Sequence, residues 1–171
     1  MAEDVLQPWE SFYVITGSSG GALTGLMFVV IALSPASKLE DAEGGMRAFG
    51  SPTIVHFCAV LLLSSVLSMP GHTGATIEAS VAATGLVGLA ISGWVVVGAR
   101  RQRGYAVVLS DWIWHVALPL VAYACVLAFG LAVRTHPGLA LHAIAAAVLF
   151  LLLVGIHNAW DAAVWIVTQR R

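Results

Sequence analysis

The chain has 171 residues, of which 59% are hydrophobic and only 10% are charged, and its formal net charge is −1. Soluble domains carry roughly 25% charged residues, so this composition excludes an ordinary soluble fold and predicts a protein embedded in the lipid bilayer. A net charge near zero gives no indication of a nucleic-acid partner.

Five apolar stretches are each long enough for a membrane-crossing helix, which needs about 20 residues for a hydrocarbon core of about 30 Å. In chain order they span approximately residues 8–34, 52–69, 73–99, 110–133 and 137–168. Ser51 and Pro52 are typical of a helix start, and Pro70 followed by Gly71 is typical of a helix end. The sequence therefore predicts an all-α, polytopic bundle of five transmembrane helices in one domain, residues 1–171.

The first stretch contains three glycines at four-residue spacing, Gly17, Gly21 and Gly25. Glycines at this spacing form a smooth helix face on which a second helix packs closely. The partner is either another helix of the same subunit or a second copy of the chain. Since five short helices leave little room for a pore, we expect a homo-oligomer. The acidic start of the chain lacks the basic region of a signal peptide, so the first helix is expected to be retained.

Basic residues predict the orientation, because Lys and Arg favour the cytoplasmic side of a membrane. With the N-terminus outside and the C-terminus cytoplasmic, only Arg134 lies outside. The other seven are then cytoplasmic: Lys38, Arg47, Arg100, Arg101, Arg103, Arg170 and Arg171.

The last two stretches carry the same pair of polar residues in opposite order, Asp111 with His115 and His157 with Asp161. A spacing of four residues places both members of a pair on one helix face. In an antiparallel hairpin that turns near His136, the reversed order brings the two aspartates to one depth and the two histidines to another. Both depths lie toward the cytoplasmic side.

A third histidine is predicted at the same level. His56 follows Ser51 by five residues, as His115 follows Ser110, so both imidazoles lie about 7 Å from a helix start. Pro119 has no amide hydrogen for the His115 carbonyl and is expected to kink the helix there. The sequence thus predicts one polar layer with three histidines and two aspartates.

Ionisable residues inside spans cost about 2.5 kcal/mol or more and usually mark ion paths, proton relays or ligand sites. As a metal site, the layer would use His115 and His157 as ligands, Asp111 and Asp161 as ligands or orienting groups, and His56 as a third imidazole. Such donors suit Zn, Fe, Mn or Cu(II). The role of the metal, whether transported, structural or catalytic, stays open.

Other interpretations use the same residues. Without metal, the layer would be the titratable gate or proton relay of an oligomeric channel or transporter. Two histidines could also hold a haem axially, which ranks third among the cofactor hypotheses because the aspartates would have no role. A noncatalytic assembly partner would dock through the Gly17 face. Alternatively, Asp111 only favours a helix start and the imidazoles only join helices.

No motif of a soluble enzyme is present: there is no nucleophile elbow, glycine-rich phosphate loop or Cys-x-x-Cys pair. Cys58 and Cys125 lie in apolar stretches and are expected to be reduced, buried thiols. Whether the protein is an enzyme stays open.

Four segments, "ALTGLMFVVIAL", "SPTIVHFCAVLL", "LSDWIWHVALPLVAYA" and "GIHNAWDAAVWIV", cover much of the chain. On these segments the chain resembles a group of small bacterial membrane proteins with five spans. The resemblance implies location in the bacterial inner (plasma) membrane. It implies no activity and identifies no catalytic residue.

Overall fold

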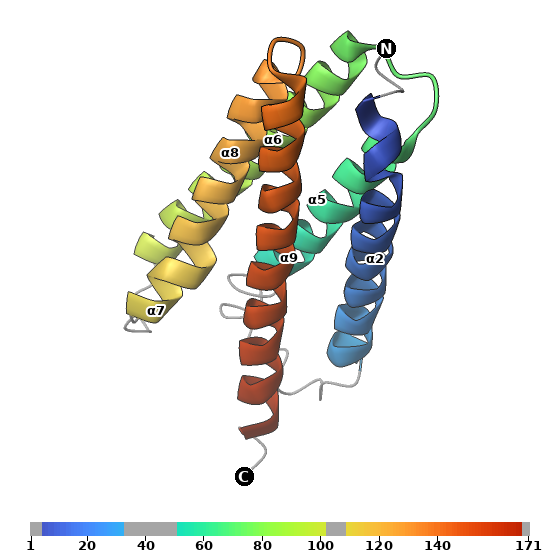
Figure 1. Ribbon diagram of the computed structural model, residues 1–171. Helices are drawn as coiled ribbons and strands as arrows, with labels where there is room; N and C mark the ends of the chain where they lie inside the picture. The colour runs from blue at the N-terminus through green and yellow to red at the C-terminus, as the bar shows by residue number, and fades with distance from the viewer. Residues whose placement is uncertain (1–4, 33–50, 102–108, 169–171) are drawn as a thin grey trace.

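A computed structural model describes residues 5–32, 51–101 and 109–168, all drawn as helices and their short connections in Figure 1. Within these ranges the chain forms helices and turns and contains no strand, so the predicted all-α class is confirmed. The segments 33–50, 102–108 and 169–171 lie outside the described residues. They carry five basic residues of the orientation argument: Lys38, Arg47, Arg103, Arg170 and Arg171.

The helices alternate in direction, so that α2 and α9 both begin at the end where α8 turns into α9 (Figure 1). The long helices are α2 (Glu10–Ala32), α5 (Ser51–Ser68), α6 (Gly74–Arg101), α8 (Leu118–Ala132) and α9 (Pro137–Thr168). Three short elements precede two of them: η1 (Gln7–Trp9) leads into α2, and α7 (Leu109–Trp112) with the π-helical turn η3 (Ile113–Ala117) leads into α8.

Four helical segments of the described chain are long and apolar enough to cross a membrane: Gln7–Ala32, Gly74–Val97, Ile113–Ala132 and Pro137–Val164. The fifth apolar helix, Pro52–Ser68, is shorter. At 1.5 Å per residue it measures about 25 Å, less than the hydrocarbon core of about 30 Å. It ends at Ser68, and the turn that follows contains Pro70 and Gly71, whose φ of 77° is the left-handed conformation that glycine favours. Many large hydrophobic side chains lie exposed on the outside, among them Phe28, Leu86 and Leu153, as expected for contact with lipid.

Two helix pairs form the bundle, with α2 packed on α5 and α6 packed on α8, and α9 lies against both α8 and α5 (Figure 1). Glycines make the closest approaches. A Cβ added at Gly85 would lie 2.6 Å from the Leu127 backbone nitrogen, and one at Gly88 would lie 2.1 Å from the Tyr123 ring. The α6–α8 contact therefore depends on residues without side chains.

The glycine stripe of α2 is divided between two environments. A Cβ at Gly17 would lie 2.8 Å from the Cβ of Ser64, whereas Gly21 has only Leu61 at 3.9 Å and Gly25 has nothing within 4 Å. Ser64 also hydrogen-bonds Thr16 of α2 at 3.0 Å. The first glycine thus packs within the subunit, while the last faces outward.

Both cysteines are free thiols, but only one fits the expected burial. Cys125 is partly buried, whereas Cys58 is exposed. The expectation that Cys58 is buried was wrong, because this part of α5 faces a groove between α5 and α6.

Candidate functional site

His56 lies near the start of α5 with its side chain inside the bundle, where it is 2% exposed. Its Nδ1 is 2.9 Å from the hydroxyl of Tyr123 on α8, and the two ring centroids are 5.7 Å apart. This is a hydrogen bond between helices in an apolar interior. Sequence reasoning missed Tyr123, although a tyrosine inside an apolar stretch needs a partner for its hydroxyl.

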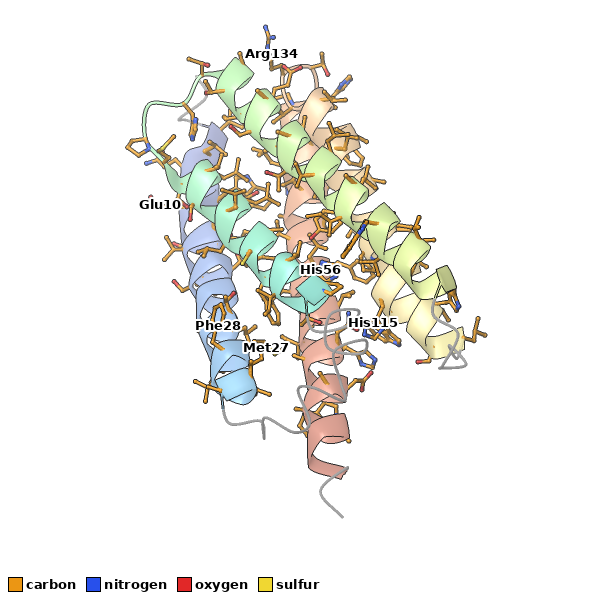
Figure 2. The ribbon with its side chains drawn as sticks, turned by 180° about the vertical axis from the view of Figure 1, so that it is seen from behind. Glu10, Met27, Phe28, His56, His115 and Arg134 are labelled. Atoms are coloured by element: carbon orange, nitrogen blue, oxygen red, sulfur yellow. The ribbon has the colours of Figure 1, made fainter. Side chains whose placement is uncertain are left out.

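His115 lies in the π-helical turn η3 and is also buried, at 8% exposure. It is near enough to His56 for their charges to interact, and Figure 2 shows the two side chains at the same end of the bundle. The structure therefore brings together two of the three predicted histidines.

The turn η3 changes which backbone carbonyl lacks a donor. The Leu118 amide donates to the Ile113 carbonyl, five residues back, and Pro119 has no amide hydrogen. The Trp114 carbonyl consequently accepts a side-chain hydrogen bond from Asn158 Nδ2 on α9, at 3.4 Å. The sequence had pointed to the His115 carbonyl, one residue further, because it assumed a regular α-helix before Pro119.

His157 and Asp161 form the predicted pair one turn apart on α9, with 3.2 Å between Nε2 and Oδ2. The distance fits an ion pair, but the alignment is not that of a hydrogen bond. Their side chains are 34% and 52% exposed. The His157 ring stacks on Trp114 at 3.7 Å with an interplanar angle of 25°. His157 therefore lies at the level of η3, with an indole against its face.

Four of the five predicted site residues fall into two groups. His56 and His115 lie inside the bundle, while His157 and Asp161 lie on its partly exposed flank and connect to η3 through Trp114. Asp111 belongs to α7, and its side chain is outside the described residues. Among the side chains that are described, no three His, Cys, Asp or Glu are placed to hold one metal ion.

Asn158 is a second residue that sequence reasoning missed. It is 1% exposed, and its Oδ1 is buried with no hydrogen-bond partner among the described residues. The Nε2 of His56 is likewise buried and has no hydrogen-bond partner among the described residues. An uncharged amide beside His157 gives little signal in a sequence, although a buried amide requires partners for both of its ends.

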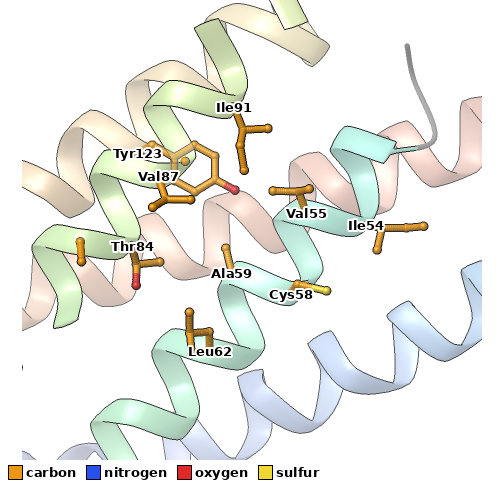
Figure 3. A pocket seen from close by; sticks show the side chains of 11 residues that line it. Ile54, Val55, Cys58, Ala59, Leu62, Thr84, Val87, Ile91 and Tyr123 are labelled. Atoms are coloured by element: carbon orange, nitrogen blue, oxygen red, sulfur yellow. The ribbon is translucent and has the colours of Figure 1, made fainter. Parts of the chain in front are cut away.

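A groove of about 340 Å³ lies between α5 and α6, and Tyr123 of α8 forms part of its wall (Figure 3). Its walls are almost entirely apolar and include Val55, Cys58, Leu62, Thr84, Ile91 and Tyr123. The polar residues of the site do not line it, apart from the tyrosine.

No protein-family model, curated protein or solved structure matches the chain. The chemistry of the site is therefore argued from its geometry. Two imidazoles and a phenol are each able to donate and accept hydrogen bonds, and all three are buried inside the bundle.

Proposed function

We propose that the protein is an oligomeric membrane channel or transporter that moves protons, or ions coupled to protons, through the site formed by His56, Tyr123 and His115. The observation that carries the proposal is the buried hydrogen bond between His56 and Tyr123 beside a second buried imidazole. Ionisable groups in an apolar bundle are costly, and they usually mark ion paths or proton relays.

The neighbouring groups support a relay. Both ring nitrogens of histidine and the hydroxyl of tyrosine can exchange roles as donor and acceptor, which a proton transfer requires. The half-exposed pair of His157 and Asp161 lies at the same level and offers protons contact with water. Trp114 connects that pair to η3 and therefore to His115.

The opposite half of the bundle supports an oligomer. Beyond Tyr123 the core contains apolar side chains such as Leu63, Val126 and Ile144, all fully buried. Among the described residues, buried polar side chains further along, such as Thr16 and Ser64, bond to each other rather than to the site. A path across the membrane would run between copies of the chain.

The proposed placement is a bacterial inner membrane, with five spans, the N-terminus outside and the site near the cytoplasmic face. The excess of Lys and Arg near the helix ends on the side of the site supports this orientation. The short α5 would be the fifth span, matched to the membrane by local thinning or by the flanking residues.

Proton flux into vesicles tests the proposal. Protein in liposomes that contain a pH-sensitive dye should give flux that changes between about pH 5 and pH 7.5, where histidine changes charge. His115→Gln and His56→Gln should lose this dependence, and the exposed His136→Gln should keep it. Flux equal to that of protein-free liposomes at every pH would overturn the proposal.

A metal site is the second candidate, and the buried Nε2 of His56 favours it, since this nitrogen has no partner among the described residues and can bind a metal. His56 and His115 would be ligands, with Asp111 completing the set and His157 nearby. Zn, Fe, Mn or Cu(II) suits such donors. Elemental analysis of purified protein should then show stoichiometric metal that His56→Ala and His115→Ala remove. Equal, substoichiometric metal in all three proteins would exclude it.

A further inference from the structure

Nε2 of His56 and Oδ1 of Asn158 are among the buried polar atoms that have no hydrogen-bond partner in the described residues. Their side chains are 2% and 1% exposed. An unpaired buried polar atom costs about 1–3 kcal/mol, and roughly 90% or more of such groups in proteins are paired. Two such atoms in one region indicate a ligand that pairs both.

Both atoms belong to side chains that surround η3. His56 lies near enough to His115 for their charges to interact, and Asn158 donates to the carbonyl of Trp114, the residue before His115. The helices that carry them are also in contact here, because a Cβ at Gly155 would lie 2.5 Å from the ring of Phe57. The two polar atoms therefore lie in the same small part of the bundle.

We propose that this region is an internal water site, in which water is hydrogen-bonded to His56 Nε2 and Asn158 Oδ1 and Asn158 is the residue that positions it. The hydrogen bond to the Trp114 carbonyl requires Nδ2 on that side, so Oδ1 is left as an acceptor. Water donates to this oxygen.

The proposal is compatible with either tautomer of His56. If Tyr123 donates to Nδ1, then Nε2 carries the hydrogen and donates to the water. If Nδ1 donates to Tyr123, then Nε2 accepts from the water. Only a ligand that both donates and accepts satisfies His56 in both forms, which a metal cation or an apolar group does not.

The role of this water rests on the proposed function: it would connect the flank of His157 and Asp161 with the buried His56. The presence of the water does not depend on flux, so it is tested separately. Water-edited solid-state NMR of isotopically labelled protein in lipid vesicles measures how fast magnetisation passes from water to each side chain. Single His→Gln variants assign the imidazole signals.

In the wild-type protein, His56 should receive water magnetisation nearly as fast as the exposed His136 and at least several-fold faster than the dry core residue Ile144, which is 0% exposed. Asn158→Leu should slow the transfer to His56 several-fold. Ser64→Ala, which alters a buried polar pair on the α2 side, should not.

If His56 in the wild type is as slow as Ile144, the proposal is overturned, and no variant is needed for that result. Rapid transfer that Asn158→Leu leaves unchanged removes the assignment of Asn158 as the positioning residue. If Asn158→Leu does not fold, Asn158→Ser serves in its place, because its short side chain cannot reach the same point. Loss of flux with normal transfer to His56 would count against the proposed function alone.

Discussion

Two buried tyrosines differ in one respect, the partner of the hydroxyl. Tyr13 and Tyr123 are 1% and 0% exposed, but the Tyr123 hydroxyl is hydrogen-bonded to His56, while the Tyr13 hydroxyl has no partner among the described residues. Tyr123→Phe should therefore lower the free energy of unfolding by about 1–3 kcal/mol, because it leaves a buried imidazole nitrogen unpaired. Tyr13→Phe should leave it unchanged or raise it slightly. Thermal unfolding in detergent measures both, and an equal loss in the two variants would contradict the role given to the His56 bond.

The depth of the site residues could be read from the sequence, whereas their direction could not. Spacing from the helix starts placed His56 and His115 at one level, and the structure brings these two side chains near each other. The direction of the side chains depends on η3. Its turn contains one residue more than a regular α-helical turn, which rotates the residues before it by about 100° around the helix axis. Trp114 therefore meets His157 in the structure. Asn158 and Tyr123 carry no charge, so neither produced a pattern that sequence reasoning could use.

At the scale of the helices, the contact between α6 and α8 is set by glycine. Gly88→Ala would place a Cβ about 2 Å from the Tyr123 ring, and overpacking of this kind typically costs about 1–3 kcal/mol. Gly93→Ala in the same helix has nothing within 4 Å and should be neutral or stabilising. Unfolding temperatures of the two variants make the comparison. Equal stability would show that α6 and α8 separate easily at this point.

The π-helical turn η3 should depend on Pro119. Pro119→Ala supplies an amide hydrogen for the His115 carbonyl, four residues back as in a regular α-helix, so η3 should shift toward a regular α-helix and turn His115 away from His56. The NMR signals of both imidazoles should then change. Pro137→Ala is the matched control, because proline in the first turn of α9 removes no helical hydrogen bond. Unchanged imidazole signals in Pro119→Ala would show that side-chain packing alone holds η3.

The all-helical class was easier to predict from the sequence than which helices are long enough to cross a membrane. The apolar stretches predicted the helical class because each is long and bounded by proline, glycine or serine, and α9 begins at Pro137 as expected. The first glycine of α2 and the last were not distinguishable in the sequence, since both have the same spacing. Their difference arises from α5, which covers Gly17 and leaves Gly25 open.

At the scale of the whole molecule, we expect a second copy of the chain to pack on the outward face of α2, which contains Gly25. Gly25→Leu should weaken self-association while leaving the fold of the monomer intact, because nothing lies within 4 Å of its Cβ position. Gly17→Leu should instead disrupt the α2–α5 contact and lower the unfolding temperature. Subunit counting by single-molecule photobleaching in lipid separates the two effects. If Gly25→Leu leaves the number of subunits unchanged, the oligomer uses another face.

In the proposed function, assembly through the outward face of α2 and transport depend on each other. Because the core beyond Tyr123 is largely apolar, a single subunit should conduct poorly. The flux per chain should therefore fall when the vesicles contain, on average, fewer chains than one oligomer needs. Gly25→Leu should show this fall at protein densities where the wild type still conducts. A flux per chain that is independent of density in both proteins would mean that a single bundle carries the whole path.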